Sequence, residues 1–194
     1  MSKLPYVNRF VVCALTLVWV TLRTPELPAQ QQPPAGYWSL DRSSSSIEFV
    51  ARARLGDVEG QFHEWSFTGA VPQNLAQARG QISVDVASID TRNQRRDDHL
   101  RNPDFFEVER FPTAVFIVQS VEVDQDLVYV TGQMQIKGKT LPVELELERS
   151  ETANRLELKG AMHIRRFDYG ITYNSVINPI ENVVLMRLHL VFVH

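Results

Sequence analysis

Residues 143–148 read Val-Glu-Leu-Glu-Leu-Glu, a strict alternation of an aliphatic side chain with a carboxylate. Successive side chains of a β-strand point to opposite faces, so this alternation predicts a strand with one apolar face and one acidic face. Leu145 is thereby assigned to the interior and Glu146 to solvent.

The same period of two recurs along most of the chain and predicts eight half-buried strands. Turn residues such as Gly56, Asn74, Asp124 and Asn154 separate the stretches. Eight such strands favour an antiparallel barrel or a sandwich. The stretches are residues 47–53, 58–71, 82–86, 114–123, 127–136, 143–148, 156–164 and 184–192.

Residues 91–100 break this alternation because they are dense in charge and contain no β-branched side chain after Thr91. They predict a short surface helix, with Asp90 or Thr91 as N-cap and Pro103 limiting its far end. The run from Arg96 to His99 has two interpretations. It is either an acid/base site or a set of ion pairs that stabilises an exposed helix, and we favour the second.

The first 29 residues have the order of a secretory signal peptide. Lys3 and Arg9 precede a thirteen-residue weakly polar run at 10–22, and a proline-containing segment ends at Ala29. This order predicts cleavage after Ala29 and a periplasmic or secreted protein. The alternative is a membrane anchor, but crossing a bilayer needs roughly 20 apolar residues and this run is shorter. Residues 30–36 then form a Gln/Pro-rich tether, and the domain spans residues 37–194.

Composition argues against several functions. The net charge is −3, with 20 basic and 23 acidic residues, so no basic field exists for nucleic acid. The single cysteine, Cys13, lies in the leader, and the five histidines are scattered. No phosphate-binding loop, nucleophile elbow or zinc-protease motif occurs. We therefore expect no catalytic residues, no metal and no cofactor.

Several segments together resemble the YceI-like family. They are Ser88-Ile89-Asp90-Thr91, Arg96-Asp97, His99-Leu100, Phe105-Phe106 and Pro112-Thr113, with further likeness at 38–49, 132–142 and 166–171. Two positions depart from the family pattern, since Ser44 and Ala53 stand where members often carry histidine. A head-group role for either histidine would be vacant here.

The resemblance implies an all-β fold, an eight-stranded antiparallel lipocalin-like barrel with a short charged helix and a long apolar lumen. It also implies that an isoprenoid lipid, such as a prenyl quinone or polyprenyl phosphate, is bound there for transport or storage. We interpret one group of residues as a structural motif: Asp90, Thr91, Arg96, Asp97, His99, Phe105, Phe106, Arg166 and Asp168. The candidate lumen residues are Phe49, Phe62, Val84, Val86, Leu145, Leu158, Met162, Met186, Leu188 and Leu190.

Two rival functions stay open from sequence. A barrel filled by its own side chains would serve as an interaction or stress-related module, because eight strands enclose a lumen only just wide enough for side chains or one small ligand. An enzyme that modifies a bound lipid is the other rival. The expected partner is the isoprenoid lipid, with no nucleic acid and no stable membrane insertion after cleavage. The sequence is also compatible with a homodimer.

Overall fold

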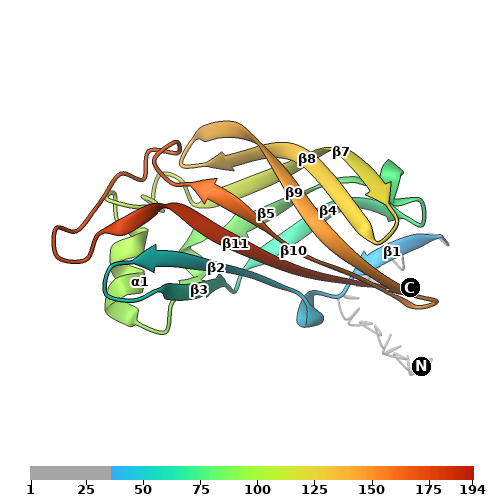
Figure 1. Cartoon of the computed structure of the whole chain (residues 1–194), viewed down its shortest axis with the longest axis horizontal. Coiled ribbons are helices and arrows are strands. Elements are labelled where there is room, and N and C mark those ends of the chain that lie inside the picture. Colours follow the sequence, from blue (N-terminus) through green and yellow to red (C-terminus); the bar gives the residue numbers. More distant parts are fainter. Residues whose placement is uncertain (1–35) are drawn as a thin grey trace, which may run out of the picture. The chain divides into compact units, whose positions relative to one another are not determined.

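The computed structural model describes residues 36–194 (Figure 1). The described residues belong to one compact unit. The expected signal peptide and most of the expected tether lie outside the described residues.

Strands make up most of this unit, and one α-helix interrupts them. The helix α1 spans Gln94–Arg101, and 3₁₀ turns occupy Arg42–Ser44, Leu75–Gln77 and Val86–Ser88. The strands are β1 (Tyr37–Leu40), β2 (Ser46–Ala53), β3 (Val58–Phe62), β4 (Trp65–Pro72), β5 (Arg79–Asp85), β6 (Ile89–Asp90), β7 (Thr113–Asp124), β8 (Leu127–Ile136), β9 (Lys139–Thr152), β10 (Arg155–Arg165) and β11 (Ile180–Val193).

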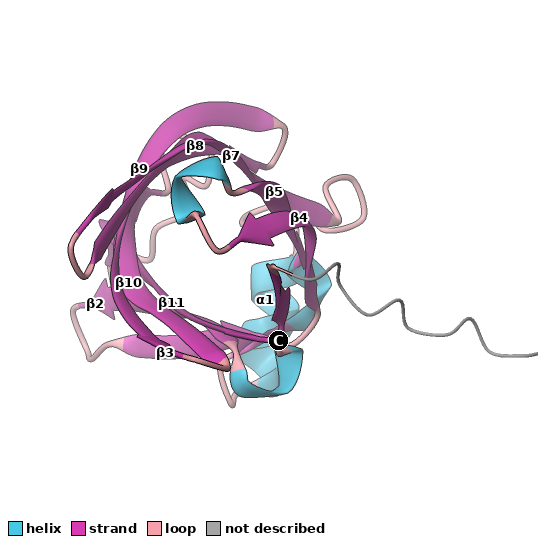
Figure 2. Cartoon of the chain, turned by 90° about the vertical axis from the view of Figure 1, so that its right-hand side faces the viewer, coloured by secondary structure: helices cyan, strands magenta, loops and turns pink. Residues whose placement is uncertain are grey.

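Eight strands close the barrel, all by antiparallel pairing (Figure 2). The ring runs β1-β4-β5-β7-β8-β9-β10-β11 and returns to β1, because Ser39 pairs with Val193. The strands β2, β3 and β6 extend the wall from β11 at the end of the barrel that carries α1. The expected eight-stranded antiparallel barrel is therefore confirmed, and the sandwich alternative is wrong.

Strand parity follows the sequence pattern closely. Leu145 is 4% exposed, whereas Glu146 on the same strand faces solvent. Every strand of the ring contributes buried side chains to one continuous apolar core. Burial of aliphatic area at about 25 cal/mol per Å² is the main term that holds such a barrel together.

The eight strands of the ring are not the eight predicted ones, because β1 was not predicted and β2, predicted as 47–53, lies outside the ring. Two further local expectations were wrong. Residues 58–71 form two strands, because the chain turns at His63 and Glu64: β3 pairs with β2 and β6, whereas β4 pairs with β1 and β5. The N-cap of α1 is Asn93, whose side-chain oxygen accepts from the backbone N–H of Arg96 at 3.1 Å. Asp90 accepts from the N–H of Arg92 instead, in the turn before the helix.

Candidate ligand cavity

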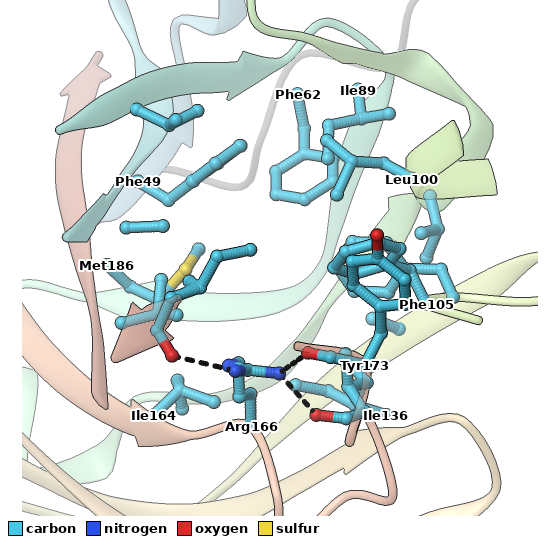
Figure 3. Close-up of a pocket in the computed structure, with 18 of the residues that line it drawn as sticks. Phe49, Phe62, Ile89, Leu100, Phe105, Ile136, Ile164, Arg166, Tyr173 and Met186 are labelled. Carbon is cyan, nitrogen blue, oxygen red and sulfur yellow. Dashed lines mark hydrogen bonds between the residues drawn. The ribbon is translucent and has the colours of Figure 1, made fainter. Parts of the chain in front are cut away.

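A cavity of about 360 Å³ lies at the α1 end of the barrel. Its walls come from β2, β3, β5, β7, β8, β10 and β11, from α1, and from the loop between β10 and β11. Figure 3 shows Phe49 and Phe62 toward the top of the cavity and Ile164 and Ile136 toward the bottom, with Met186 between the two levels. The lining is predominantly aliphatic and aromatic, as in pockets that bind apolar ligands.

The ten candidate lumen residues fall into three groups. Five of them line this larger cavity: Phe49, Phe62, Val84, Val86 and Met186. Three line a smaller cavity of about 80 Å³, toward β1: Leu145, Leu158 and Leu190. The remaining two, Met162 and Leu188, are 5% and 4% exposed and line neither. The single long lumen implied by the resemblance is thus divided into two cavities.

Arg166 is a buried cation in the wall of the larger cavity. Its Nε donates to the carbonyl of Glu181, and its two Nη atoms donate to the carbonyls of Ile171, Tyr173 and Ile180, at 2.7–2.9 Å (Figure 3). Burial lowers the pKa of Arg166 from its ordinary value, but a guanidinium stays protonated in proteins. One side chain therefore connects the start of the β10–β11 loop to two later residues of the loop and to the first two residues of β11.

Thr91 connects α1 to the barrel wall through two charged side chains. Arg96 donates from Nε to the Thr91 hydroxyl at 2.7 Å and from Nη2 to the Thr91 carbonyl at 2.8 Å. The buried carboxylate of Asp97 accepts from the N–H and the hydroxyl of the same residue. These contacts fit the structural interpretation of the group. Arg96 also lines the larger cavity, which the sequence did not indicate.

Aromatic side chains close one side of this cavity. His99 lies edge-on to Phe105 and to Tyr173, with ring centroids 5.0 and 4.8 Å apart, and its Nε2 is 3.2 Å from a carboxylate oxygen of Asp104. Phe106 stands edge-on to Phe62 at 6.4 Å. His99, Phe105 and Phe106 were interpreted as structural, and all three also line the cavity.

Four members of the structural motif line neither cavity: Thr91 and Asp97, described above, and Asp90 and Asp168. Asp90 pairs with His63 at 2.9 Å across β3 and β6, and the hydrogen bond from His63 lowers the pKa of Asp90. Asp168 pairs with Arg165 at 3.2 Å on the surface. Of the two departures from the family pattern, Ala53 lines the larger cavity, whereas Ser44 lies in a 3₁₀ turn and donates its backbone N–H to the N-cap carboxylate of Asp41.

The sequence pattern did not indicate that residues of the β10–β11 loop line the cavity. Tyr173, Ser175 and Asn178 line the cavity from a segment that lacks any alternating pattern. Tyr173 was detectable only as an aromatic residue soon after the 166–171 motif. The tip of this loop exposes Val176 and Ile177 to solvent.

Within residues 36–194, no three His, Cys, Asp or Glu side chains gather closely enough to hold a metal ion. In the same range, no helix has the length and apolar character needed to cross a bilayer.

A closed antiparallel barrel around an apolar cavity defines a lipocalin-like binding barrel. The YceI-like domain matches residues 38–192, and the chain belongs to that family. Protein YceI of Escherichia coli is 36% identical over 74 residues, which are 38% of this chain and 39% of that protein. The chain thus aligns with about two fifths of the length of such curated relatives.

Solved structures show the same fold. BcnA of Burkholderia cenocepacia superposes with a TM-score of 0.73 at 23% identity, over 79% of this chain and 99% of that one. A polyisoprenoid binding domain from Saccharophagus degradans, implicated in plant cell wall breakdown, gives a TM-score of 0.63 at 19% identity. That match covers 81% of this chain and 98% of the other.

Proposed function

We propose that the protein binds the hydrocarbon chain of an isoprenoid lipid in the larger cavity and carries it in the periplasm or outside the cell. The observation that supports this most is the cavity itself: about 360 Å³ enclosed mainly by aliphatic and aromatic side chains. The description of the Saccharophagus degradans domain as polyisoprenoid binding points to the same class of ligand.

The energetics suit a hydrocarbon guest. Each buried CH₂ contributes about 0.8 kcal/mol, so an isoprenoid chain gains affinity without any strong polar contact. The walls supply the matching surface through side chains such as Met186 on β11, Ile164 on β10 and Phe49 on β2.

We place the polar end of a ligand beside α1. Arg96 and His99 line the cavity from α1, where they bring N–H donors next to apolar surface. The carbonyl oxygen of a prenyl quinone and the phosphate oxygens of a prenyl phosphate are acceptors that suit such donors. The expected signal peptide is the basis for placing the carrier in the periplasm or outside the cell.

Displacement of a hydrophobic fluorescent probe tests the proposal. We expect the delipidated protein to bind the probe and farnesol to displace it. Met186→Glu puts a carboxylate into the cavity, where it must be neutralised or hydrated, and both outcomes oppose an apolar guest. This variant should lose the probe, whereas Arg187→Gln, on the exposed face of the same strand, should keep it.

The rival functions give different results in the same assay. Wild-type protein that binds neither probe nor isoprenoid would contradict the proposal and favour an interaction module. Recovery of the isoprenoid in a chemically altered form would instead indicate an enzyme. Circular dichroism first establishes that each variant is still a β-barrel.

A further inference from the structure

The two cavities meet at one side chain. Phe116 on β7 is the single residue, among residues 36–194, that lines both the larger and the smaller cavity. Its side chain is 5% exposed and therefore lies within the barrel. The inward residue before it on β7, Ala114, lines the larger cavity, and the one after it, Val118, lines the smaller.

A glycine on the neighbouring strand leaves room for the Phe116 ring. A methyl group at Gly132 on β8 would lie 2.5 Å from Cε2 and 2.6 Å from Cζ of Phe116. Such distances are sterically forbidden, so the ring can rest against β8 only because residue 132 has no side chain. The ring therefore occupies the space that a side chain at position 132 would fill.

Met162 and Leu188 complete a partition with Phe116, which we call the floor. Three successive inward residues of β11 show where the floor lies. Met186 lines the larger cavity and Leu190 lines the smaller one, whereas Leu188 between them lines neither. Met162 holds the same intermediate place on β10, between Ile164 and Leu158. Along β7, β10 and β11, each of the three residues of the floor thus stands between a residue of the larger cavity and one of the smaller cavity.

The volume of the larger cavity limits the length of the hydrocarbon chain that it can hold. A dry cavity of about 150 Å³ accepts benzene, which is roughly 25 Å³ per carbon atom. At that ratio, 360 Å³ accommodates about 14 carbon atoms, or about three isoprene units. Longer chains would have to leave part of their hydrocarbon in water or displace the floor.

We infer that Phe116 determines the chain length of the ligand, so that the protein prefers an isoprenoid of about three units over the long polyprenyl chains. This inference rests on the proposed function, because it concerns the same cavity. Phe116→Ala removes the ring that separates the cavities and joins the smaller volume of about 80 Å³ to the larger. The joined cavity accepts a longer chain.

A chain-length series tests the inference. Farnesol, geranylgeraniol and solanesol have three, four and nine isoprene units, and each is titrated against the bound fluorescent probe. Wild-type protein should bind farnesol at least about tenfold more tightly than solanesol. Phe116→Ala should raise the affinity for geranylgeraniol by at least about tenfold, because each added buried CH₂ contributes about 0.8 kcal/mol.

Phe67→Ala is the matched control. Phe67 on β4 also rests over a glycine, Gly80, and lines only the smaller cavity. The loss of this ring costs similar packing but leaves the floor intact, so the chain-length preference should stay that of wild type. Phe116→Leu, a smaller truncation, serves if the alanine variant does not fold, and it should shift the preference in the same direction.

Two results would overturn the inference. One is equal affinity of wild-type protein for farnesol and solanesol, which needs no variant to fold and leaves the proposed function standing. The other is a folded Phe116→Ala or Phe116→Leu protein with an unchanged preference. Failure of wild-type protein to bind any of the three isoprenoids contradicts the proposed function itself.

Discussion

Asp97 on α1 accepts two hydrogen bonds from Thr91, one from its backbone N–H at 2.9 Å and one from its hydroxyl. Both residues are buried, at 5% and 4% exposure. The carboxylate thereby satisfies two donors that have no access to water. This pair attaches the helix to the end of β6 and so helps to form the wall of the larger cavity.

Asp97→Ala should lower the free energy of unfolding by about 2–4 kcal/mol, because a hydrogen bond to a charged group contributes about 1.5–3 kcal/mol and both donors lose their acceptor. Urea denaturation measures the change. Asp98→Ala is the control, since the neighbouring carboxylate is 62% exposed and pairs only on the helix surface. Equal effects of the two substitutions would contradict the structural role of Asp97.

Arg166→Met should release the β10–β11 loop, because four carbonyl groups lose their donor. We expect a loss of about 2–4 kcal/mol in the free energy of unfolding, and faster hydrogen exchange at residues 171–181. Ile177→Ser changes the same loop at a side chain that is 77% exposed and should leave stability unchanged. A loop that exchanges as slowly in Arg166→Met as in wild type would refute the anchoring role.

The stability of the barrel should depend on pH through Glu157. Hydrogen bonds from Lys159 and Arg155 lower the pKa of Glu157 from 4.5 to about 2. Since the folded-state pKa is the lower one, the stabilisation is fully present above about pH 4.5 and is lost as the pH falls toward 2.

Glu157→Gln should therefore be less stable than wild type at neutral pH, with the difference vanishing near pH 2 and shrinking in high salt. Thermal melts across this pH range measure the difference. Glu144→Gln, an exposed carboxylate on β9, is the control and should give a curve parallel to wild type. A difference for Glu157→Gln that stays constant with pH would contradict the role of the ion pair.

The leader remains a prediction from the charge, length and proline order of residues 1–29. Removal of this segment leaves 165 residues with 17 basic and 22 acidic side chains and no cysteine. N-terminal sequencing of protein recovered from the periplasm or the medium should begin near Gln30. Recovery of membrane-bound protein that still begins at Met1 would show that the segment is an anchor.

The sequence predicted the barrel because a period of two is a local property. At Leu145 and Glu146, the alternation alone assigns each side chain to its face, and burial of one face leaves no other register. The division of the interior was not predictable in this way. It depends on which inward side chain lies over a glycine of the next strand, as Phe116 does over Gly132, and on cross-strand register that no single segment contains.

The cavity wall shows the same limit. Arg166 belonged to a recognisable motif, but two of its four acceptors, Ile171 and Tyr173, lie in a loop without periodicity, and the other two are at the start of β11. Its place beside the cavity therefore emerged only from the folded chain. The turn after β3 did leave a signal in the sequence, because the consecutive polar residues His63 and Glu64 shift the alternation by one residue between Phe62 and Trp65. At this turn the chain leaves β3, which pairs with β2 and β6, and enters β4, which pairs with β1 and β5.

Organic extraction of protein freshly purified from its own cells, followed by mass spectrometry, tests most directly whether the barrel carries an isoprenoid. We expect wild-type protein to release an isoprenoid lipid in an amount approaching one molecule per chain, and folded Met186→Glu to release little or none. Wild-type protein that yields no isoprenoid, or folded Met186→Glu that yields the wild-type amount, would contradict binding in the larger cavity.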